Sequence, residues 1–257
     1  MRPVPDPNPL PAVVLVHGFA QTGACLGPLA ADLAADHLVV LPDLPGHGRS
    51  EAPADADLWA IADVLAGAAS ATPSGRATFV GYSLGGRACL HVALAHPGVV
   101  DRLVLIGATA GIDDVADRAA RAASDERLAE HLEAVGVDRF LDEWLAGPLF
   151  AGLPTSARFD DERRANTAAG LAASLRHAGT GAMEPLWDRV GAIEVPTLLL
   201  AGERDGKFAA LARRLAASIG PNAVVEVVPG AGHAAHLEAP DATIALIRSF
   251  CGATAGR

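Results

Sequence analysis

Short apolar segments alternate with Ala- and Leu-rich segments along most of this chain of 257 residues. Each apolar segment is rich in β-branched residues and is flanked by turn formers, which is typical of a strand buried on both faces. The expected strands are residues 13–16, 38–41, 78–80, 103–106, 197–200 and 224–228. Helical spacing between them predicts helices at 26–35, 58–69, 84–95 and 208–218. Strands that alternate with helices predict an α/β fold, with a mostly parallel sheet and helices on both of its faces.

The alternation stops between residues 112 and 190, where the pattern is charged and helical and contains no candidate strand. Helices are expected there at 118–136, 137–145 and 159–177. A helical insertion between two strands of an α/β sheet most naturally covers the sheet edge where the loops gather. We therefore expect one domain over residues 1–257, with a helical cap inserted at 112–190.

The charge balance narrows the possible functions. The chain has 30 Asp and Glu against 20 Lys and Arg, a formal net charge of −10, whereas a nucleic-acid binder needs a basic surface. Apolar types make up 51% of the residues and charged types 19%, which indicates a packed domain rather than a disordered segment or a coiled coil. Every basic residue except Lys207 is Arg, and we attribute this bias mainly to GC-rich codon usage.

No apolar run reaches the length of about 18 residues that a membrane span needs, and the start of the chain lacks the apolar core of a signal peptide. We therefore expect a cytoplasmic protein. Cys25, Cys89 and Cys251 form neither an even disulfide set nor a C-x-x-C pair, so buried free thiols are expected. No metal or organic cofactor is implied, and a monomer and a homo-oligomer are both compatible with the sequence.

The segment with the strongest chemical signal is VGYSLGGR at residues 80–87, a G-x-S-x-G motif centred on Ser83. It lies directly after an expected strand and directly before an expected helix, which is the context of a nucleophile elbow. The glycines around Ser83 let neighbouring backbones approach closely, and the helix N-terminus favours negative charge on the hydroxyl. The context, more than the motif alone, makes Ser83 a candidate catalytic residue.

A serine hydroxyl needs a histidine to take its proton and a carboxylate to orient that histidine, and after such an elbow the expected chain order is serine, acid, histidine. Asp205 follows the expected strand 197–200, and His233 follows the expected strand 224–228. Both therefore lie past the carboxyl ends of strands, where open α/β sheets place their sites. Asp205 also suits the N-cap of the next helix.

Other residues compete for these roles. Asp113, Asp114 and Glu203 are alternative carboxylates, although Glu203 is more suited to a structural hydrogen bond. The alternative histidines are His17, His47, His91, His96 and His236. None of these histidines matches the position of His233 in a late loop after a strand, although His236 is near enough in sequence to line the same pocket.

An oxyanion hole is expected from the turn VHGF that follows the first strand. Such a turn can direct a backbone N–H at developing negative charge, and the residue after the serine supplies the second donor. We therefore assign these donors to Phe19 and Leu84. The turn-rich loop DLPGHGRS at 43–50 is interpreted as a rigid connector.

Taken together, the segments VHGF, DLPGHGRS, GYSLGG, GERD and GAGH occur in the order found in α/β-hydrolases, and they extend over nearly the whole chain. A narrower resemblance is carried by GYSLGGR, FLDEWLAGPLF, GLAASLRHAGTG, GERDGKF and GAGHAAHLEAP, and by the helical segment at 118–136. With these segments the chain resembles the 2-succinyl-6-hydroxy-2,4-cyclohexadiene-1-carboxylate synthases of the menaquinone pathway. The fold is shared by many chemistries, so the narrower resemblance carries the functional expectation.

This resemblance implies a lyase that eliminates pyruvate from 2-succinyl-5-enolpyruvyl-6-hydroxy-3-cyclohexene-1-carboxylate. The triad of Ser83, Asp205 and His233 would remove a ring proton beside a carbonyl. The resemblance also implies a set of substrate-binding residues. These are Tyr82 and Arg87 at the elbow, Arg121 and either Arg163 or Arg164 in the cap, and Trp144 as an apolar wall.

Arginine suits a substrate with three carboxylates, because its guanidinium stays protonated and grips oxygens with two donors. Segment 112–190 contains nine arginines but also 15 acidic residues, so most of these arginines can be surface ion pairs. Arg87 lies one helical turn after Ser83, where its head could reach a pocket or form a salt bridge below it. The alternative function is an ordinary serine hydrolase, a carboxylesterase or a carbon–carbon bond hydrolase, in which Ser83 is the nucleophile.

Overall fold

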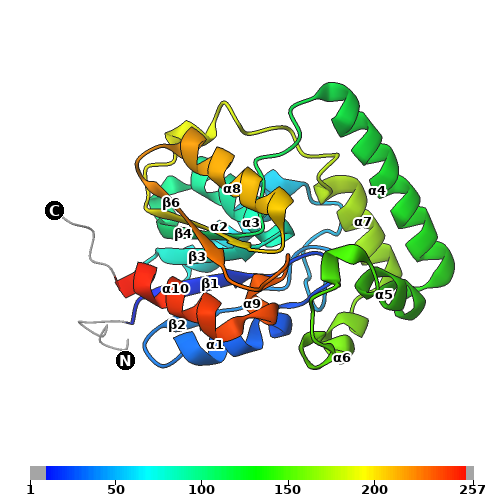
Figure 1. Ribbon diagram of the computed structural model, residues 1–257, viewed down its shortest axis with the longest axis horizontal. Helices are drawn as coiled ribbons and strands as arrows, with labels where there is room; N and C mark the ends of the chain where they lie inside the picture. The colour runs from blue at the N-terminus through cyan, green and yellow to red at the C-terminus, as the bar shows by residue number, and fades with distance from the viewer. Residues whose placement is uncertain (1–9, 253–257) are drawn as a thin grey trace, which may run out of the picture.

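A six-stranded sheet in which every neighbouring pair of strands is parallel forms the centre of the protein, in the order β2-β1-β3-β4-β5-β6 (Figure 1). The computed structural model describes residues 10–252. The strands are β1 (Ala12–Val16), β2 (Leu38–Val40), β3 (Ala77–Tyr82), β4 (Val100–Ile106), β5 (Thr197–Gly202) and β6 (Ala223–Val228). All six strands coincide with segments expected from the sequence, so the prediction of an α/β fold with a parallel sheet is confirmed.

Helices cover both faces of this sheet. One face packs against α2 (Leu58–Ser70), α3 (Leu84–Ala95) and α8 (Gly206–Ile219), and the other packs against α1 (Gly27–Leu33), α9 (Ala235–Glu238) and α10 (Pro240–Gly252). Successive strand residues alternate between the two cores: Val14 belongs to the first and Val13 to the second. This alternation follows from the two-residue period of a strand, and burial on both faces explains the uninterrupted apolar runs.

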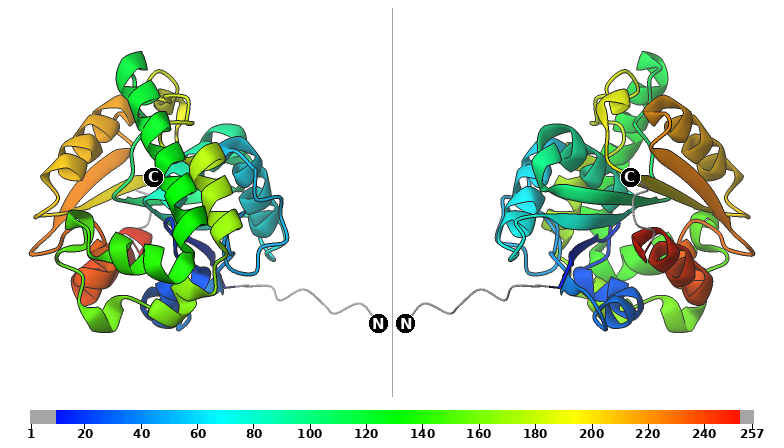
Figure 2. Two further views of the ribbon diagram at one scale, coloured as in Figure 1. Left: turned by 90° about the vertical axis from the view of Figure 1, so that its right-hand side faces the viewer. Right: turned by 90° about the vertical axis from the view of Figure 1, so that its left-hand side faces the viewer.

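Segment 112–190 leaves the sheet after β4 and returns to it at β5 without forming a strand. Its helices are α4 (Val115–Val135), α5 (Val137–Leu145), α6 (Asp160–Arg164) and α7 (Ala168–Ala178), with short 3-10 turns η3 (Pro148–Phe150), η4 (Thr155–Ala157) and η5 (Val190–Ala192). The two views of Figure 2 and the view of Figure 1 place α4, α5 and α7 together beside the sheet. A separate apolar cluster of α4, α5 and α7 side chains, to which Ala20 also belongs, holds this layer together.

One predicted element is wrong: the continuous helix at 159–177 is two helices. The backbone bonds of Thr167 are extended, and its hydroxyl accepts a hydrogen bond from the Gly170 N–H, which caps the start of α7. Asn166 lies just before this cap and uses its side-chain amide to donate to the Arg163 carbonyl. Short polar side chains that bind nearby backbone groups compete with helix continuation, which explains the break.

Other differences are small. The described chain also contains η1 (Gly23–Leu26), η2 (Pro97–Val99) and the helices α9 and α10, which the sequence patterns do not predict. Cys25 and Cys89 are buried free thiols as expected, whereas Cys251 is only partly buried. No helix among residues 10–252 combines the length and the apolar character needed to cross a membrane.

Candidate active site

Ser83 lies at the sharp turn between β3 and α3. Its φ of 51° and ψ of −106° put it in a strained region of backbone space that serine rarely adopts. The turn is possible because Gly85 packs against the backbone carbonyls of Val16 and His17, where an added Cβ would collide. The Ser83 side chain is thereby presented above the N-terminus of α3.

Asp205 combines the two roles considered for it. One carboxylate oxygen accepts the Phe208 N–H at 3.2 Å and so caps α8, and the other lies 2.8 Å from His233 Nδ1. Burial opposes ionisation of Asp205, but the hydrogen bonds from His233 and from the Phe208 N–H outweigh it and hold the pKa of this carboxyl below its usual value. Asp205 is therefore a fixed carboxylate oriented at the imidazole.

His233 lies in the loop after β6, with its side chain between Asp205 and Ser83. His233 Nδ1–H donates a hydrogen bond to the Asp205 carboxylate. Nε2, which lies 3.3 Å from Ser83 Oγ, is then free to accept a hydrogen bond from the hydroxyl. The Phe208 ring packs on the imidazole at a centroid distance of 4.4 Å. Contacts at hydrogen-bond distance thus link Ser83, His233 and Asp205, which follow β3, β6 and β5.

The turn after β1 presents a free backbone donor beside this chain. The Gly18 N–H donates to Gln21 Oε1 and the Ala20 N–H lies 3.3 Å from His47 Nε2, whereas no bond is found for the Phe19 N–H among the described residues. The Leu84 N–H belongs to the first turn of α3 and has no partner within the helix. Phe19 and Leu84 line the same cavity as Ser83, so their amides are compatible with the predicted oxyanion hole.

Two buried histidines hold this turn in place. His17 accepts the Leu44 N–H at 2.9 Å, and its ring packs against His47 at 5.1 Å. Burial is the largest cause that lowers the pKa of His17 to about 4 and of His47 to about 3. Both rings are therefore neutral near pH 7, as acceptors of backbone N–H groups must be, and neither contacts Ser83.

The competing residues have structural partners elsewhere. Asp113 forms an exposed ion pair with Arg214 at 2.6 Å, Asp114 caps α4, and Glu203 accepts the Gly230 N–H at 2.9 Å. His236 is buried against Tyr82 and does not line the cavity that contains Ser83. Glu203 therefore has the structural hydrogen bond expected for it.

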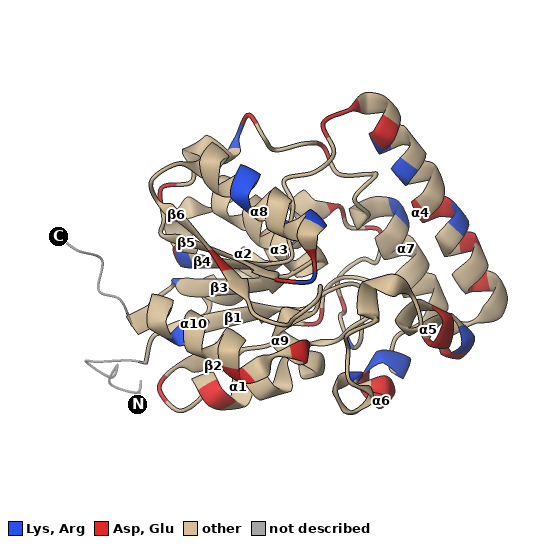
Figure 3. Ribbon diagram, in the orientation of Figure 1, with Lys and Arg blue, Asp and Glu red and all other residues tan. Residues whose placement is uncertain are grey.

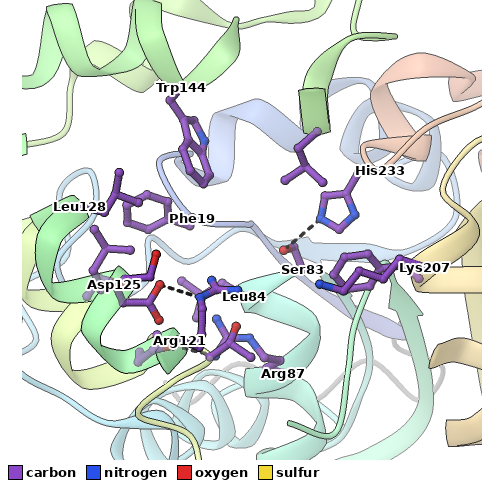
Figure 4. A pocket seen from close by; sticks show the side chains of 18 residues that line it. Phe19, Ser83, Leu84, Arg87, Arg121, Asp125, Leu128, Trp144, Lys207 and His233 are labelled. Atoms are coloured by element: carbon purple, nitrogen blue, oxygen red, sulfur yellow. Dashed lines mark hydrogen bonds and ion pairs between the residues drawn. The ribbon is translucent and has the colours of Figure 1, made fainter. Parts of the chain in front are cut away.

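A cavity of about 360 Å³ opens over Ser83 and extends beneath the helices of segment 112–190 (Figure 4). Its walls combine apolar side chains with three cations and one carboxylate: Phe19, Leu128, Trp144, Leu149, Phe208, Arg87, Arg121, Lys207 and Asp125. Cavities of this kind, mostly apolar with a few convergent polar groups, are typical of small-molecule sites.

Arg87 lines the cavity from within the protein. It is 7% exposed and donates to the Ala178 carbonyl at the end of α7, at 2.7 Å. Burial, followed by the proximity of Arg121, lowers the pKa of the Arg87 guanidinium to about 10, which still leaves it charged near pH 7. A cation held in so little water interacts strongly with an anionic ligand.

Arg121 reaches the same region from α4 (Figure 4). Its Nε donates to Asp125 at 2.7 Å, and the second oxygen of Asp125 accepts the Gly181 N–H at 3.2 Å. Among the nine arginines of the described segment 112–190, Arg121 alone lines this cavity. Several others form surface ion pairs, such as Arg176 with Glu126, and Figure 3 shows both signs of charge along α4.

Three predicted binding residues do not line the cavity. Tyr82 is buried behind the triad, with its ring 5.4 Å from that of His233. Arg163 is fully buried and donates to the carbonyls of Ala20 at 2.9 Å and Arg158 at 2.6 Å. Arg164 lies on the surface, in ion pairs with Asp138 and Asp142. The short helix α6 turns adjacent arginines in different directions, one to the interior and one to solvent, and neither to the cavity.

Two features of the cavity were missed from the sequence. Lys207 lines it, two residues after Asp205 in the segment GERDGKF, so the motif itself contained the signal. Ser174 and Trp144 also line the cavity, although the Ser174 hydroxyl and the Trp144 indole N–H are themselves buried and have no hydrogen-bond partner in the described part of the chain. The position of Trp144 is compatible with the predicted apolar wall.

Comparison with known proteins agrees with this arrangement. A family model described as alpha/beta hydrolase fold matches residues 11–240. The chain belongs to the α/β-hydrolase family. The solved structure of MenH from S. aureus superposes on this α/β-hydrolase with a TM-score of 0.88 at 30% identity, and covers 95% of this chain and 94% of that one.

Named relatives of this α/β-hydrolase point to one group within the family. A 2-succinyl-6-hydroxy-2,4-cyclohexadiene-1-carboxylate synthase of Escherichia coli is 33% identical over 244 residues, 92% of each chain. The synthase of the same name from Enterobacter sp. is 32% identical over 239 residues, 92% of this chain and 90% of that one. A thermophilic esterase from Thermogutta terrifontis has a TM-score of 0.77 at 25% identity, covering 95% and 90% of the two chains.

Proposed function

We propose that this α/β-hydrolase is a 2-succinyl-6-hydroxy-2,4-cyclohexadiene-1-carboxylate synthase, a lyase that eliminates pyruvate from the enolpyruvyl precursor. The observation that carries the proposal is one cavity that joins Ser83 and His233 to two cations, Arg87 and Arg121. A substrate with three carboxylates needs such cations, whereas the ester of a simple alcohol does not. The relatives with this name, which align with more than nine-tenths of this chain, also support the proposal.

The reaction needs a base rather than a nucleophile. The proton to be removed is on the ring carbon that bears the succinyl group, where the adjacent ketone makes it acidic. As that proton leaves, its electron pair forms a new ring double bond, the existing double bond shifts by one position, and the bond to the enolpyruvyl oxygen breaks. The atoms and electrons then balance as a cyclohexadiene and the enolate of pyruvate, which takes up a proton on carbon.

In this mechanism Ser83 takes the ring proton while His233 accepts the hydroxyl proton through Nε2. Asp205, which binds Nδ1 at 2.8 Å, stabilises the imidazolium that forms. Negative charge develops on the succinyl ketone oxygen, and we assign its stabilisation to the amides of Phe19 and Leu84, two residues that line the cavity with Ser83. The succinyl and ring carboxylates are assigned to Arg87 and Arg121. No acyl-enzyme forms.

The alternative, a serine hydrolase, uses the same three residues with Ser83 as nucleophile, and the structural similarity to an esterase favours it. The two functions differ in what the cavity must hold. A carboxylesterase needs an acyl subsite and an alcohol subsite. An apolar acyl group bound against a buried cation such as Arg87 would remove water from the guanidinium without replacing it by a polar partner, which opposes binding.

The test is to incubate the purified protein separately with the enolpyruvyl substrate and with p-nitrophenyl esters of short acids. We expect stoichiometric pyruvate from the first, detected by lactate dehydrogenase and NADH, and at most slow release of p-nitrophenol from the second. Ser83→Ala, the matched control, should abolish pyruvate release. Efficient ester turnover with no pyruvate would replace the lyase with the hydrolase.

A further inference from the structure

Lys207 is the third cation of the cavity and the one that the proposed mechanism does not yet use. It is the second residue of α8, and the Asp205 N-cap that starts this helix also binds His233. The position of Lys207 is therefore tied to the triad. In Figure 4 Lys207 lies to the right of Ser83, whereas Arg121 lies to its lower left and Arg87 below it.

Lys207 is exposed, and its charge acts on the Asp205 carboxylate without a direct bond to it. Among the described residues no hydrogen bond or ion pair to its ammonium is found, and the ammonium lies 5.7 Å from the centroid of the Phe208 ring. The nearest carboxylate in sequence, Asp205, has one oxygen bonded to the Phe208 N–H and the other to His233. By contrast, Arg121 is bonded to Asp125 and Arg87 to the Ala178 carbonyl.

The location of Lys207 is unfavourable for the helix itself. Cations in the first turn are repelled by the positive end of the helix dipole, and the backbone N–H groups there offer them no acceptor. Lys207 is also the only lysine in a chain with 19 arginines. A residue that breaks a local rule without a compensating partner is expected at a functional position.

We infer that Lys207 binds the carboxylate of the enolpyruvyl group, the part of the substrate that leaves as pyruvate. This inference rests on the proposed function. The carbon that loses its proton and the carbon that loses pyruvate lie across the ring from each other, so a substrate centred on Ser83 extends its succinyl and enolpyruvyl arms in opposite directions. The two arginines to the lower left of and below Ser83 match the succinyl and ring carboxylates, and the one compact ammonium to its right matches the third.

Binding at this place also assists the chemical step. When the carbon–oxygen bond breaks, the departing fragment carries an enolate oxygen beside its carboxylate, so its negative charge increases. An ammonium next to both oxygens stabilises the transition state more than the ground state. Loss of the Lys207 charge should therefore lower kcat, and not only raise KM.

The experiment compares Lys207→Met, which keeps the length but removes the charge, with Lys207→Arg, which keeps the charge. Arg213→Met is the matched control, because Arg213 is exposed on the same helix and does not line the cavity. We expect kcat/KM for pyruvate release to fall about tenfold in Lys207→Met, mostly through kcat, and to recover in part in Lys207→Arg. Arg213→Met should stay within twofold of the parent.

Inhibition by the two halves of the substrate identifies which carboxylate is bound. Pyruvate and succinate are each measured as competitive inhibitors of the parent, Lys207→Met and Arg121→Met. We expect Lys207→Met to weaken pyruvate inhibition at least fivefold and to leave succinate unchanged, and Arg121→Met to do the reverse. Equal weakening of both inhibitors, or no loss of kcat/KM in Lys207→Met, would overturn the assignment. A parent enzyme that releases no pyruvate would instead refute the proposed function on which the assignment rests.

Discussion

Replacing Gly107 by Ala should displace His233, the proposed proton acceptor, without substituting any residue of the proposed triad. Gly107 follows β4 with a φ of +59°, and a Cβ added there would lie 2.9 Å from His233 Cε1 and 3.1 Å from Nδ1. Ordinary contacts of a Cβ are 3.4 to 4 Å. The imidazole must therefore move away by about half an ångström for the alanine to fit.

The size of the effect follows from the Ser83 contact. His233 Nε2 is already 3.3 Å from Ser83 Oγ, so a shift of this size breaks the hydrogen bond or bends it out of line. Misplacement of a catalytic group by an ångström costs up to about a hundredfold in rate, so we expect Gly107→Ala to lower kcat/KM about ten- to a hundredfold. The left-handed backbone also costs about 1 to 2 kcal/mol of stability when it carries a side chain.

Gly75→Ala separates these two effects. Gly75 has a φ of +68° and nothing within 4 Å of an added Cβ, so it has the backbone penalty without the collision. Both variants should lower Tm by a few degrees, and only Gly107→Ala should lose activity. Because the lyase and the hydrolase both use His233, either assay serves. If Gly107→Ala kept activity within twofold of Gly75→Ala, the positioning of His233 by β4 would be disproved.

Two further predictions concern charge. Arg121→Met removes a cation of the cavity, so it should raise KM for the tricarboxylate at least tenfold and leave ester turnover unchanged. Arg164→Ala should leave both quantities within twofold of the parent, because Arg164 pairs with Asp138 on the surface. Steady-state kinetics on both substrates test this, and an Arg164→Ala variant that behaved like Arg121→Met would contradict it. His17 has a folded-state pKa of about 4 against 6.5 when unfolded, so the unfolded chain binds the extra proton and stability falls as the pH drops from 6.5 to 4. The free energy of unfolding, measured with urea between pH 7 and 4.5, should fall less steeply with pH in His17→Gln than in the parent, by about 1.4 kcal/mol per pH unit. An unchanged pH dependence would contradict a buried neutral His17.

The candidate catalytic residues could be placed from the sequence because each follows a strand. Ser83, Asp205 and His233 come directly after β3, β5 and β6, and the carboxyl ends of parallel strands meet at one edge of the sheet. Their convergence is therefore a property of topology, which local patterns reveal. The sequence patterns did not predict the break between α6 and α7, because α6 ends at Arg164 and Thr167 starts α7 inside a stretch with uniform helical spacing.

The order of strands and helices and the choice of Ser83, Asp205 and His233 as candidates came from the sequence alone, because they depend on local periodicity and on motifs at strand ends. Only the tertiary structure decided which of the expected cations line the cavity. Arg163 and Arg164 are adjacent in sequence, yet one is buried against Ala20 and the other pairs with Asp138. Lys207 enters the site because α8 is packed beside the triad. The direction and the partners of a long side chain are set by elements distant in sequence, and no local pattern contains them.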